Sequence, residues 1–407
     1  MDERVAMSER EVDRLLILRK VVDQRLTQVA AAEQLHVTDR WVRTLCARLV
    51  TRGARGLIHA LRGRPSNHQL APGLLDRAVA LVRAKYPDFG PTLAGETLAE
   101  RHGLRLSRET LRQGLRRAGL WRGRRQDPPY RAWRTPRAAV GELVQLDGSP
   151  HAWFEDRGPR CTLVSYVDDA TSTIPYAEFI PEETTRDLLR TTGAYLRRYG
   201  RPLAFYVDRD GIYRVNQRPT IHEQLTGGAP LSQFHRAMRE LGIDLIFAQS
   251  PQAKGRVENR FGTLQDRLVK ALRLARIRTL DAANAFLRQT FLPQFNARFA
   301  HAPASPTDAH RPLLPAHDLA AILSLRETRQ VQQDFTIHYA GQHLQLAAPQ
   351  PVRVRPKLAV VVEARLDGSI HLWLKGRELA FTRLPAPRRP RGFQDLRRWP
   401  TVKSDAA

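Results

Sequence analysis

Residues 143–149 read Leu-Val-Gln-Leu-Asp-Gly-Ser. The first four residues form a strand-like run, and Asp147 follows it directly. Two similar runs follow at 162–167 and 174–180, rich in apolar and β-branched side chains. Such runs predict β-strands, because these side chains pack well on a pleated, half-buried surface. The periodicity changes near residue 140, so we expect a sheet-containing domain to begin at about residue 138.

Beyond these runs, helical and strand-like patterns alternate. Three strands followed by alternating helices and strands predict a mixed α/β sheet with helices on its faces. This order is compatible with a ribonuclease-H-like core at 138–310, in which two acids come from strand ends and one from a helix. The expected elements are a helix at 182–199, a strand at 203–207, a helix at 231–241, a strand at 243–247 and a helix from 251 to about 272.

Two of the predicted strands end in an acid, Asp147 and Asp208, and a third acid, Glu258, lies in the predicted helix from 251. Ser250 can cap that helix and Pro251 can begin it, which places Glu258 about two turns inside. If the first and fourth strands are neighbours, the two aspartates meet at one edge of the sheet. The helix can then reach the same edge.

Three carboxylates brought together repel one another unless a cation neutralises them. Hard oxygen ligands suit Mg²⁺ or Mn²⁺, and two ions about 3.5–4 Å apart could activate a nucleophile and stabilise the leaving oxygen of a phosphodiester. We therefore predict that Asp147, Asp208 and Glu258 are catalytic residues that bind two such ions. Three other acids compete on position alone, although turn formation is the favoured interpretation of each: Asp168, Asp169 and Asp210.

The chain is strongly basic, with 66 Lys and Arg against 41 Asp and Glu and a formal charge of +25 over 407 residues. This balance predicts a polyanionic partner, although a GC-rich genome also favours Arg codons. Basic residues that flank Glu258 suit a substrate built of phosphate groups. They are Lys254, Arg256 and Arg260. For Lys254 and Arg260, a solvated helix face is the alternative interpretation.

The segment 8–61 has the pattern of a helix-turn-helix module. Thr38 or Asp39 can cap its last helix by accepting a hydrogen bond from a free amide. Val42, Leu45 and Leu49 share one face of that helix, which leaves basic residues pointing outward, as on a recognition helix in the major groove. An ordinary helical hairpin with a solvated basic face is the alternative. The residues expected to contact DNA are Arg40, Arg43 and Arg48.

A second helix-turn-helix-like module is expected at 72–122. Ser107 can cap its third helix. Arginines spaced by four form an outward basic stripe on that helix, at Arg108, Arg112 and Arg116. Two tandem modules of this kind favour a DNA-binding function more strongly than a single module does.

Three further segments are basic. The linker at 62–71 holds Arg62 and Arg64, which could enter an A·T-rich minor groove, although a plain linker fits equally well. An Arg- and Pro-rich connector at 123–137 is expected to follow the DNA backbone. The residues 386–407 predict a basic, disordered tail.

The last predicted domain is a small β-barrel at 328–385. Short alternating strands return there, with an Asp367-Gly368 hairpin turn. The expected protein is therefore multidomain, with tandem all-α helix-turn-helix modules, an α/β ribonuclease-H-like core and a small C-terminal β-barrel.

Composition excludes several classes. The two cysteines, Cys46 and Cys161, lie far apart and outside any Cys/His cluster, which excludes disulfide scaffolds and zinc fingers. The start lacks the apolar core of a signal peptide, and no run approaches about 20 apolar residues. We expect a cytoplasmic protein with no membrane partner, nucleoid-associated when bound to DNA.

The sequence resembles the DDE transposases of bacterial insertion sequences, of the ISNCY type, within the wider retroviral-integrase-like superfamily. The resemblance extends from about residue 8 to residue 385. It rests on Gln-Leu-Asp-Gly-Ser at 145–149, Tyr-Val-Asp at 206–208 with Tyr-Arg-Val-Asn at 213–216, and Ser-Pro-Gln-Ala-Lys-Gly-Arg-Val-Glu-Asn at 250–259, together with Tyr-Pro-Asp-Phe-Gly-Pro at 86–91 and Phe-Asn-Ala-Arg-Phe-Ala at 295–300.

The resemblance implies an integrase catalytic core in which Asp147, Asp208 and Glu258 bind the metal ions. Metal-bound water would attack a transposon-end phosphodiester, and the freed 3′-hydroxyl would attack target DNA. The N-terminal modules would hold the terminal inverted repeats, and the synaptic complex would be a homo-oligomer on double-stranded DNA. Two features depart from retroviral integrases: the segment between Asp208 and Glu258 is longer, and no zinc-binding His/Cys module precedes the core.

Two other functions remain open. One is a catalytically inactive helix-turn-helix DNA-binding regulator derived from a transposase, against which the three acids argue. The other is a structure-selective nuclease on the same fold, which would not need two sequence-reading modules.

Overall fold

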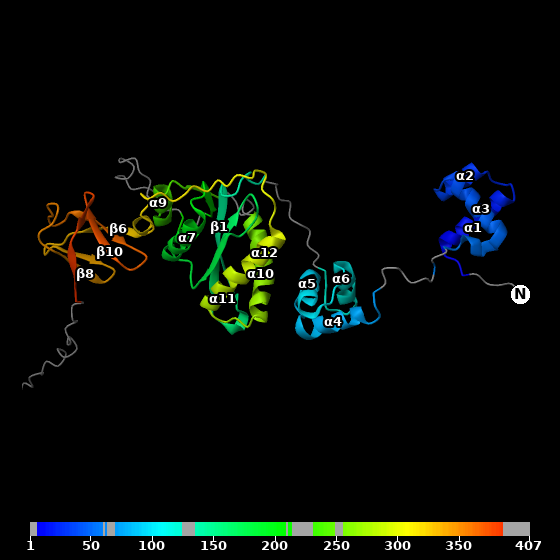
Figure 1. Ribbon diagram of the computed structural model, residues 1–407, viewed down its shortest axis with the longest axis horizontal. Helices are drawn as coiled ribbons and strands as arrows, with labels where there is room; N and C mark the ends of the chain where they lie inside the picture. Colours follow the sequence, from blue (N-terminus) through cyan, green and yellow to red (C-terminus); the bar gives the residue numbers. More distant parts are fainter. Residues whose placement is uncertain are drawn as a thin grey trace, which may run out of the picture. The chain divides into compact units, whose positions relative to one another are not determined.

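The computed structural model describes residues 6–59, 62, 70–123, 135–208, 211–213, 231–248 and 255–385, with the side chains of 255–259 left undescribed. The chain divides into two compact units, Met1–Gln126 and Asp127–Ala407 (Figure 1). The predicted tail at 386–407 and most of the two predicted linkers lie outside the described residues. In the described part of the chain, no helix combines the length and apolar character needed to cross a bilayer.

The first unit begins with a three-helix module. Its elements are α1 Glu9–Val22, α2 Gln28–Leu35, α3 Asp39–Arg52 and a 3-10 turn Gly53–Leu57. Thr38 caps α3, because its hydroxyl accepts a hydrogen bond from the Trp41 amide at 3.3 Å. Val42 and Leu45 of α3 are buried against Leu18 of α1. The capped helix and its apolar face agree with the sequence-based expectation.

Three more helices form the second module, α4 Leu74–Lys85, α5 Pro91–His102 and α6 Arg108–Arg117. Ser107 caps α6 as predicted, accepting a hydrogen bond from the Thr110 amide at 3.1 Å. Leu111 and Leu115 are buried, whereas Arg108 and Arg116 are exposed and Arg112 is partly exposed. Both halves of the first unit are thus helical, as the periodicity predicted.

The second unit contains a five-stranded sheet of β1 Leu143–His151, β2 Cys161–Asp168, β3 Tyr176–Ile180, β4 Ala204–Val207 and β5 Asp244–Phe247. The strand order is β3-β2-β1-β4-β5. Neighbouring strands are antiparallel from β3 to β1 and parallel from β1 to β5. The predicted mixed α/β sheet is therefore confirmed.

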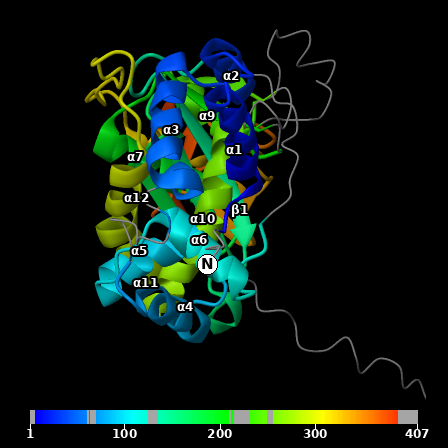
Figure 2. The ribbon, with the colours of Figure 1, turned by 90° about the vertical axis from the view of Figure 1, so that its right-hand side faces the viewer.

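Helices cover both faces of this sheet (Figures 1 and 2). One face packs through Val144, Leu146 and Phe205 against α7 Thr185–Tyr199 and α9 Gln233–Glu240. The other face packs through Leu163 and Phe179 against three helices and a π-helical turn. These are α10 Gly255–Leu274, α11 Leu280–Phe286, the turn Leu287–Phe291 and α12 Leu292–Phe299; a short 3-10 turn, Glu155–Arg157, follows β1.

The C-terminal part of this unit is all β after the short helix α13 Leu319–Ile322. Its strands are β6 Leu325–Gln330, β7 Thr336–Tyr339, β8 Gln342–Leu346, β9 Ala359–Ala364, β10 Ile370–Leu374, β11 Arg377–Leu379 and β12 Phe381–Leu384. β9 and β10 form the predicted hairpin, with Gly368 at φ 90°.

The predicted β-barrel at 328–385 requires a correction, because no closed barrel is found among the described strands. They form two sheets, β11-β10-β9-β6 and β12-β8-β7. Only Ala380 separates β11 from β12, so the chain leaves one sheet and enters the other there. The two sheets share a core that includes Ile337, Leu344 and Val360.

The outer strand β3 is held at both ends by asparagine side chains of the covering helices. Asn284 of α11 donates to the Phe179 carbonyl at 3.0 Å and accepts from the Phe179 amide at 2.7 Å. Asn296 of α12 makes the same pair of bonds with Ile174, at 2.9 and 2.8 Å. These amides replace the missing neighbouring strand at the edge of the sheet.

We predict that Asn284→Ala lowers the free energy of unfolding by roughly 2–4 kcal/mol, because it leaves a buried amide and a buried carbonyl unsatisfied. Chemical denaturation measures the change. Gln289→Ala, at an exposed position in the adjoining π-helical turn, is the matched control and should cost less than about 0.5 kcal/mol. Equal losses in the two variants would contradict the role given to Asn284.

Candidate active site

The two candidate aspartates lie on neighbouring strands. Asp208 directly follows β4, but Asp147 is the fifth of the nine residues of β1, so the prediction that Asp147 ends this strand is wrong. The parallel register pairs Leu143 with Ala204 and Gln145 with Tyr206. Continuing it by two residues brings Asp147 beside Asp208, and the two-residue alternation of a strand places both on one face. Adjacent strands lie about 4.8 Å apart, so the Cα atoms of the two aspartates lie close together. Both residues are partly exposed at the end of the sheet.

Helix α10 brings the position of Glu258 toward these aspartates. Its Gln265 donates to the Ser149 hydroxyl at 3.2 Å, and its Leu272 carbonyl accepts from Arg157 at 3.2 Å. The helix therefore runs in the same direction as β1, and its first turns lie toward Asp147. Glu258 lies seven residues before Gln265, which is two turns earlier on the same helix face.

The described part of α10 begins at Gly255, and Glu258 is its fourth described residue. The predicted cap Ser250 and the first helical residue Pro251 lie outside the described residues, as does Lys254. Only the backbone of α10 places Glu258 and Arg256, whose side chains are not described.

Asp168 and Asp169 lie at the other end of the sheet from Asp147. Asp168 is opposite Val144 in the β1–β2 register, and it accepts hydrogen bonds from the amides of Gly141 and Thr171, each at 2.9 Å. Asp169 accepts from the Gln145 side chain at 2.6 Å and from a backbone amide, that of residue 137, at 2.9 Å. These two acids hold the start of β1, while Asp210 lies outside the described residues.

A further acid, Glu183, reaches this edge and was not named from the sequence. A Cβ at Gly148 would lie 2.7 Å from the Glu183 carboxyl carbon, so the carboxylate rests directly on the backbone next to Asp147. The Tyr213 hydroxyl donates to Glu183 at 3.4 Å. Burial raises the pKa of Tyr213 far above its usual range, and the charges of Glu183, Asp208 and Asp147 raise it further.

One sequence signal could have identified Glu183. β3 and β1 are each antiparallel to β2, so they run in the same direction and end at the same edge. An acid that follows β3 directly, in the Ile-Pro-Glu-Glu-Thr stretch at 180–184, is therefore placed near Asp147. The prediction named acids at strand ends and Glu258 in the helix from 251, and it missed Glu183.

Arg260, one of the predicted DNA-contacting residues, is engaged within the second unit. Its guanidinium donates to the Phe299 carbonyl at 2.9 Å and lies over the rings of Phe295 and Phe299. Desolvation by burial lowers its pKa. Arg260 therefore anchors α10 to α12, a contact that the sequence pattern did not indicate.

Arginines on the first module have varied surroundings. Arg43 pairs with Asp39 at 3.0 Å, and the Arg48 guanidinium lies 5.1 Å from the Trp41 ring centroid. Arg40 is exposed. Arg62 pairs with Glu11, a contact that ties the start of the predicted linker to α1, and the backbone hydrogen bond from Ser8 and the contact with Arg62 lower the pKa of Glu11 to about 2. Arg64 lies outside the described residues.

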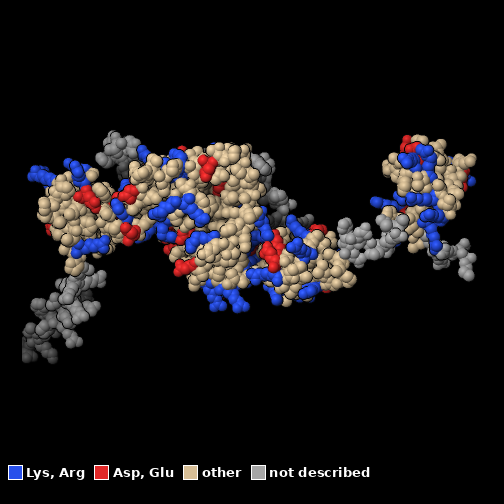
Figure 3. All heavy atoms as spheres, in the orientation of Figure 1, with Lys and Arg blue, Asp and Glu red and all other residues tan. Residues whose placement is uncertain are grey.

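On α6, Arg108 and Arg116 are exposed. Arg112 instead makes two hydrogen bonds with the Glu109 carboxylate, at 2.7 and 2.6 Å. Those bonds lower the pKa of Glu109 to about 2. Basic side chains lie on the drawn faces of both units (Figure 3).

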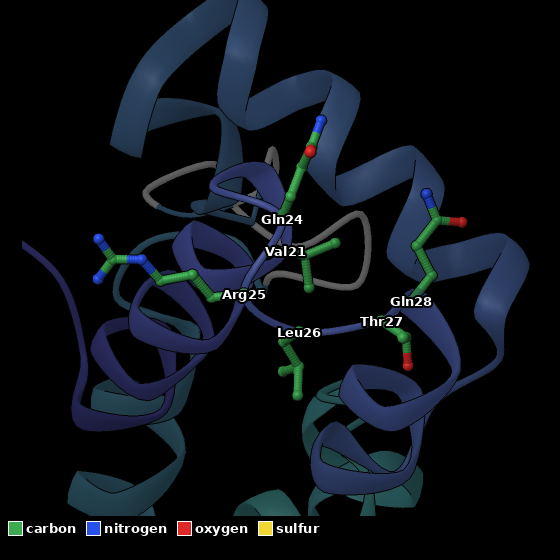
Figure 4. A pocket seen from close by; sticks show the side chains of 6 residues that line it. All are labelled: Val21, Gln24, Arg25, Leu26, Thr27 and Gln28. Carbon is green, nitrogen blue, oxygen red and sulfur yellow. The ribbon is translucent and has the colours of Figure 1, made fainter.

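A shallow hollow lies between α1 and α2, with a volume of about 350 Å³. None of the predicted site residues lines it, and its walls carry no acid (Figure 4). Its lining is Val21, Gln24, Arg25, Leu26, Thr27 and Gln28. It supplies no carboxylate to neutralise a metal ion.

The aspartates at the sheet edge have the right chemistry for a divalent cation. Two aspartates on neighbouring strands offer hard oxygen ligands, which Mg²⁺ and Mn²⁺ prefer. Among the described side chains, no group of three or more His, Cys, Asp or Glu is arranged to hold an ion. The side chain of Glu258 is not among those described, so that finding does not include it.

Comparison with known proteins identified two relatives. The y4bF protein of Sinorhizobium fredii (strain NBRC 101917 / NGR234), which carries a provisional transposase name, is 43% identical over 93% of this chain and 81% of its own length. The transposase for insertion sequence IS1202 of Streptococcus pneumoniae is 28% identical over 72% of this chain and 69% of its own length. A scan of protein-family models found no match.

Solved structures superpose weakly. A simian T-cell lymphotropic virus intasome, in complex with the PP2A regulatory subunit B56 gamma, aligns with 76% of this chain and 96% of its own at 14% identity and a TM-score of 0.32. The HTLV-2 integrase catalytic core in complex with magnesium aligns with 38% of this chain and 91% of its own at 16% identity and a TM-score of 0.27. Superpositions of this quality carry no conclusion about the site.

We predict that Asp147→Cys combined with Asp208→Cys forms a disulfide under mild oxidation, because neighbouring strands bring Cα atoms within the 4.4–6.8 Å range of disulfides. Mass spectrometry of proteolytic fragments detects the linked peptides. Burial raises the pKa of the native Cys161 thiol to about 11, which keeps it unreactive.

The matched control for this pair is Ser165→Cys with Asp208→Cys. Ser165 lies directly opposite Asp147 on β2, two strands away from Asp208 and about 10 Å distant. It should not cross-link. Equal cross-linking in both pairs would contradict the register extended above.

Proposed function

The chain belongs to the transposases, and on that premise we propose that it cleaves DNA at the ends of a mobile element and joins them to target DNA in a reaction of the DDE type. The observation that carries this proposal is the parallel pairing of β1 with β4, which sets Asp147 beside Asp208. The strand order β3-β2-β1-β4-β5 supports the assignment of this domain as a ribonuclease-H-like core.

In the proposed reaction, Asp147 and Asp208 hold Mg²⁺ or Mn²⁺, with Glu258 as the third ligand from α10. Two bound ions would supply an activated water and charge stabilisation at the scissile phosphate. The Gln265–Ser149 contact fixes α10 along β1, so that Glu258 and the aspartates keep a constant separation. Cleavage leaves a 3′-hydroxyl, whose attack on target DNA forms one phosphodiester bond as another breaks.

The helical modules are proposed to bind the terminal inverted repeats. Capped helices with an outward basic face support this role for α3 and α6. Lys254 and Arg256 are proposed to contact phosphates near Glu258, whereas the contacts of Arg260 with α12 favour a structural role. The other proposed DNA contacts are Arg40, Arg43, Arg48, Arg62, Arg64, Arg108, Arg112 and Arg116.

We further propose that the active assembly is a homo-oligomer, because one complex must hold two element ends and a target. The protein would work in the cytoplasm, at the nucleoid. A catalytically inactive DNA-binding regulator is the second candidate, and DNA binding without cleavage by the wild-type protein would favour it.

We predict that Asp147→Asn, Asp208→Asn and Glu258→Gln each lower the rate of DNA nicking by more than about 100-fold while DNA affinity stays within about twofold. Each change removes a charge that holds the cation, and losses of this size accompany removal of a group that stabilises charge in the transition state. The assay combines cleavage of DNA carrying the element's ends in Mg²⁺ with a mobility-shift measurement.

Asp244→Asn is the matched control, since Asp244 is an exposed acid at the start of β5. It should nick DNA at the wild-type rate. Wild-type activity in Asp147→Asn would refute the assignment of the three acids.

For the second module, we predict that Arg116→Ala weakens binding to the repeats and reduces the slope of log affinity against log salt by about 1. Arg112→Ala should reduce the slope less, because Glu109 already neutralises this guanidinium. Glu109→Gln should steepen the slope by releasing Arg112. If Arg116→Ala leaves both affinity and slope unchanged, the arginines of α6 form a solvated face.

A further inference from the structure

We propose that Glu183, together with Tyr213, is a positioning residue that connects the middle of β1 to the segment after β4 and strengthens cation binding by Asp147 and Asp208. This inference rests on the proposed function, since it assigns a supporting role within that same site. It concerns an acid outside the Asp147, Asp208 and Glu258 set.

The first observation is the contact between Glu183 and Gly148. A Cβ at position 148 would overlap the Glu183 carboxylate, so this contact requires glycine directly after Asp147. Glu183 lies just before Thr184, the N-cap of α7. The segment just before α7 therefore rests on the middle of β1, at the residue that follows the candidate ligand.

The second observation is the hydrogen bond from Tyr213 to Glu183. Tyr213 is buried, and its ring packs edge-to-face on Phe234 of α9 with centroids 5.2 Å apart. Tyr213 follows β4, the strand that ends at Asp208. The chain of contacts from Tyr213 through Glu183 to Gly148 thus connects the segment after Asp208 to the residue after Asp147.

Glu183 is not placed to share an ion directly with the aspartates. Successive residues of a strand face opposite sides, so the Cβ direction of Gly148 lies on the α7 side of the sheet and Asp147 faces the α10 side. In the described side chains, no three acids are arranged around a common ion. Glu183 must therefore act through the backbone of β1 and through its charge.

Both effects act in the same direction on a divalent cation. A rigid backbone at Gly148 keeps Asp147 in register with Asp208. This rigidity lowers the entropy cost of binding the cation. A third negative charge close to the pair favours a cation further, because the sheet edge is only partly solvated. Loss of the Glu183 charge should weaken metal binding without touching the ligands themselves.

The test is calorimetric titration of the full chain with Mn²⁺. Glu183→Gln keeps the shape of the side chain and its ability to accept from Tyr213, but it loses the charge. We expect it to weaken Mn²⁺ binding about 3- to 10-fold. Tyr213→Phe should weaken it about twofold, and Glu182→Gln, an exposed neighbouring acid, should leave it unchanged.

A second measurement tests the contact itself. Gly148→Ala should lower the melting temperature, because its Cβ displaces the Glu183 carboxylate. Glu183→Ala removes that carboxylate, so the double variant Gly148→Ala with Glu183→Ala should regain much of the lost stability. Additive destabilisation in the double variant would overturn the contact.

The outcomes separate the positioning role from the proposed reaction. Mn²⁺ affinities of Glu183→Gln and Glu182→Gln that agree within twofold would overturn the role of Glu183, even if the wild-type protein nicks DNA. Weakened Mn²⁺ binding in Glu183→Gln alone supports the role, and it does so even if the wild-type protein fails to cleave DNA, a result that would overturn the proposed function instead.

Discussion

The pairing of β1 with β4 is the constraint on which the second unit depends. The two strands are far apart in the sequence, and between them lie β2, β3 and α7. Their parallel register, continued by two residues, sets Asp147 in the middle of β1 beside Asp208 directly after β4, on the same face. A slip of one residue would turn Asp147 or Asp208 to the opposite face, because strand side chains alternate. The burial of Val144 and Leu146 against α7 disfavours that slip.

The rest of the domain secures this pairing from both faces. Asn284 and Asn296 close the free edge of β3, so the antiparallel half of the sheet stays regular up to β1. Gln265 fixes α10 along the other face at Ser149, two residues beyond Asp147. Asp168 and Asp169 hold the start of β1 through backbone amides and a glutamine. Acids thus serve two purposes in one sheet. Asp168 and Asp169 hold the backbone at the start of β1. Asp147 and Asp208 form the candidate metal site.

Local patterns predicted the elements well, because helix caps, apolar faces and strand runs are encoded within a few residues. Thr38 and Ser107 cap the helices that their sequences indicated, and Asp208 follows β4 as predicted, whereas β1 continues beyond Asp147 to His151. Features that depend on long-range pairing were missed. The role of Glu183 requires α7 to start over Gly148, and the open pair of C-terminal sheets depends on which strands exchange hydrogen bonds. Alternation of apolar residues is the same in a barrel and in two packed sheets.

The net charge overstates how many basic residues are available to contact DNA, because many arginines are engaged within the chain. Arg326 pairs with Glu240 and so joins β6 to α9, and Arg260 binds a carbonyl of α12. Arg112 is held by Glu109. An arginine in such a contact must break it to reach a phosphate, which reduces its net contribution to binding. Exposed arginines such as Arg116 are therefore the ones that should set the salt dependence, whereas the charge of +25 includes both groups.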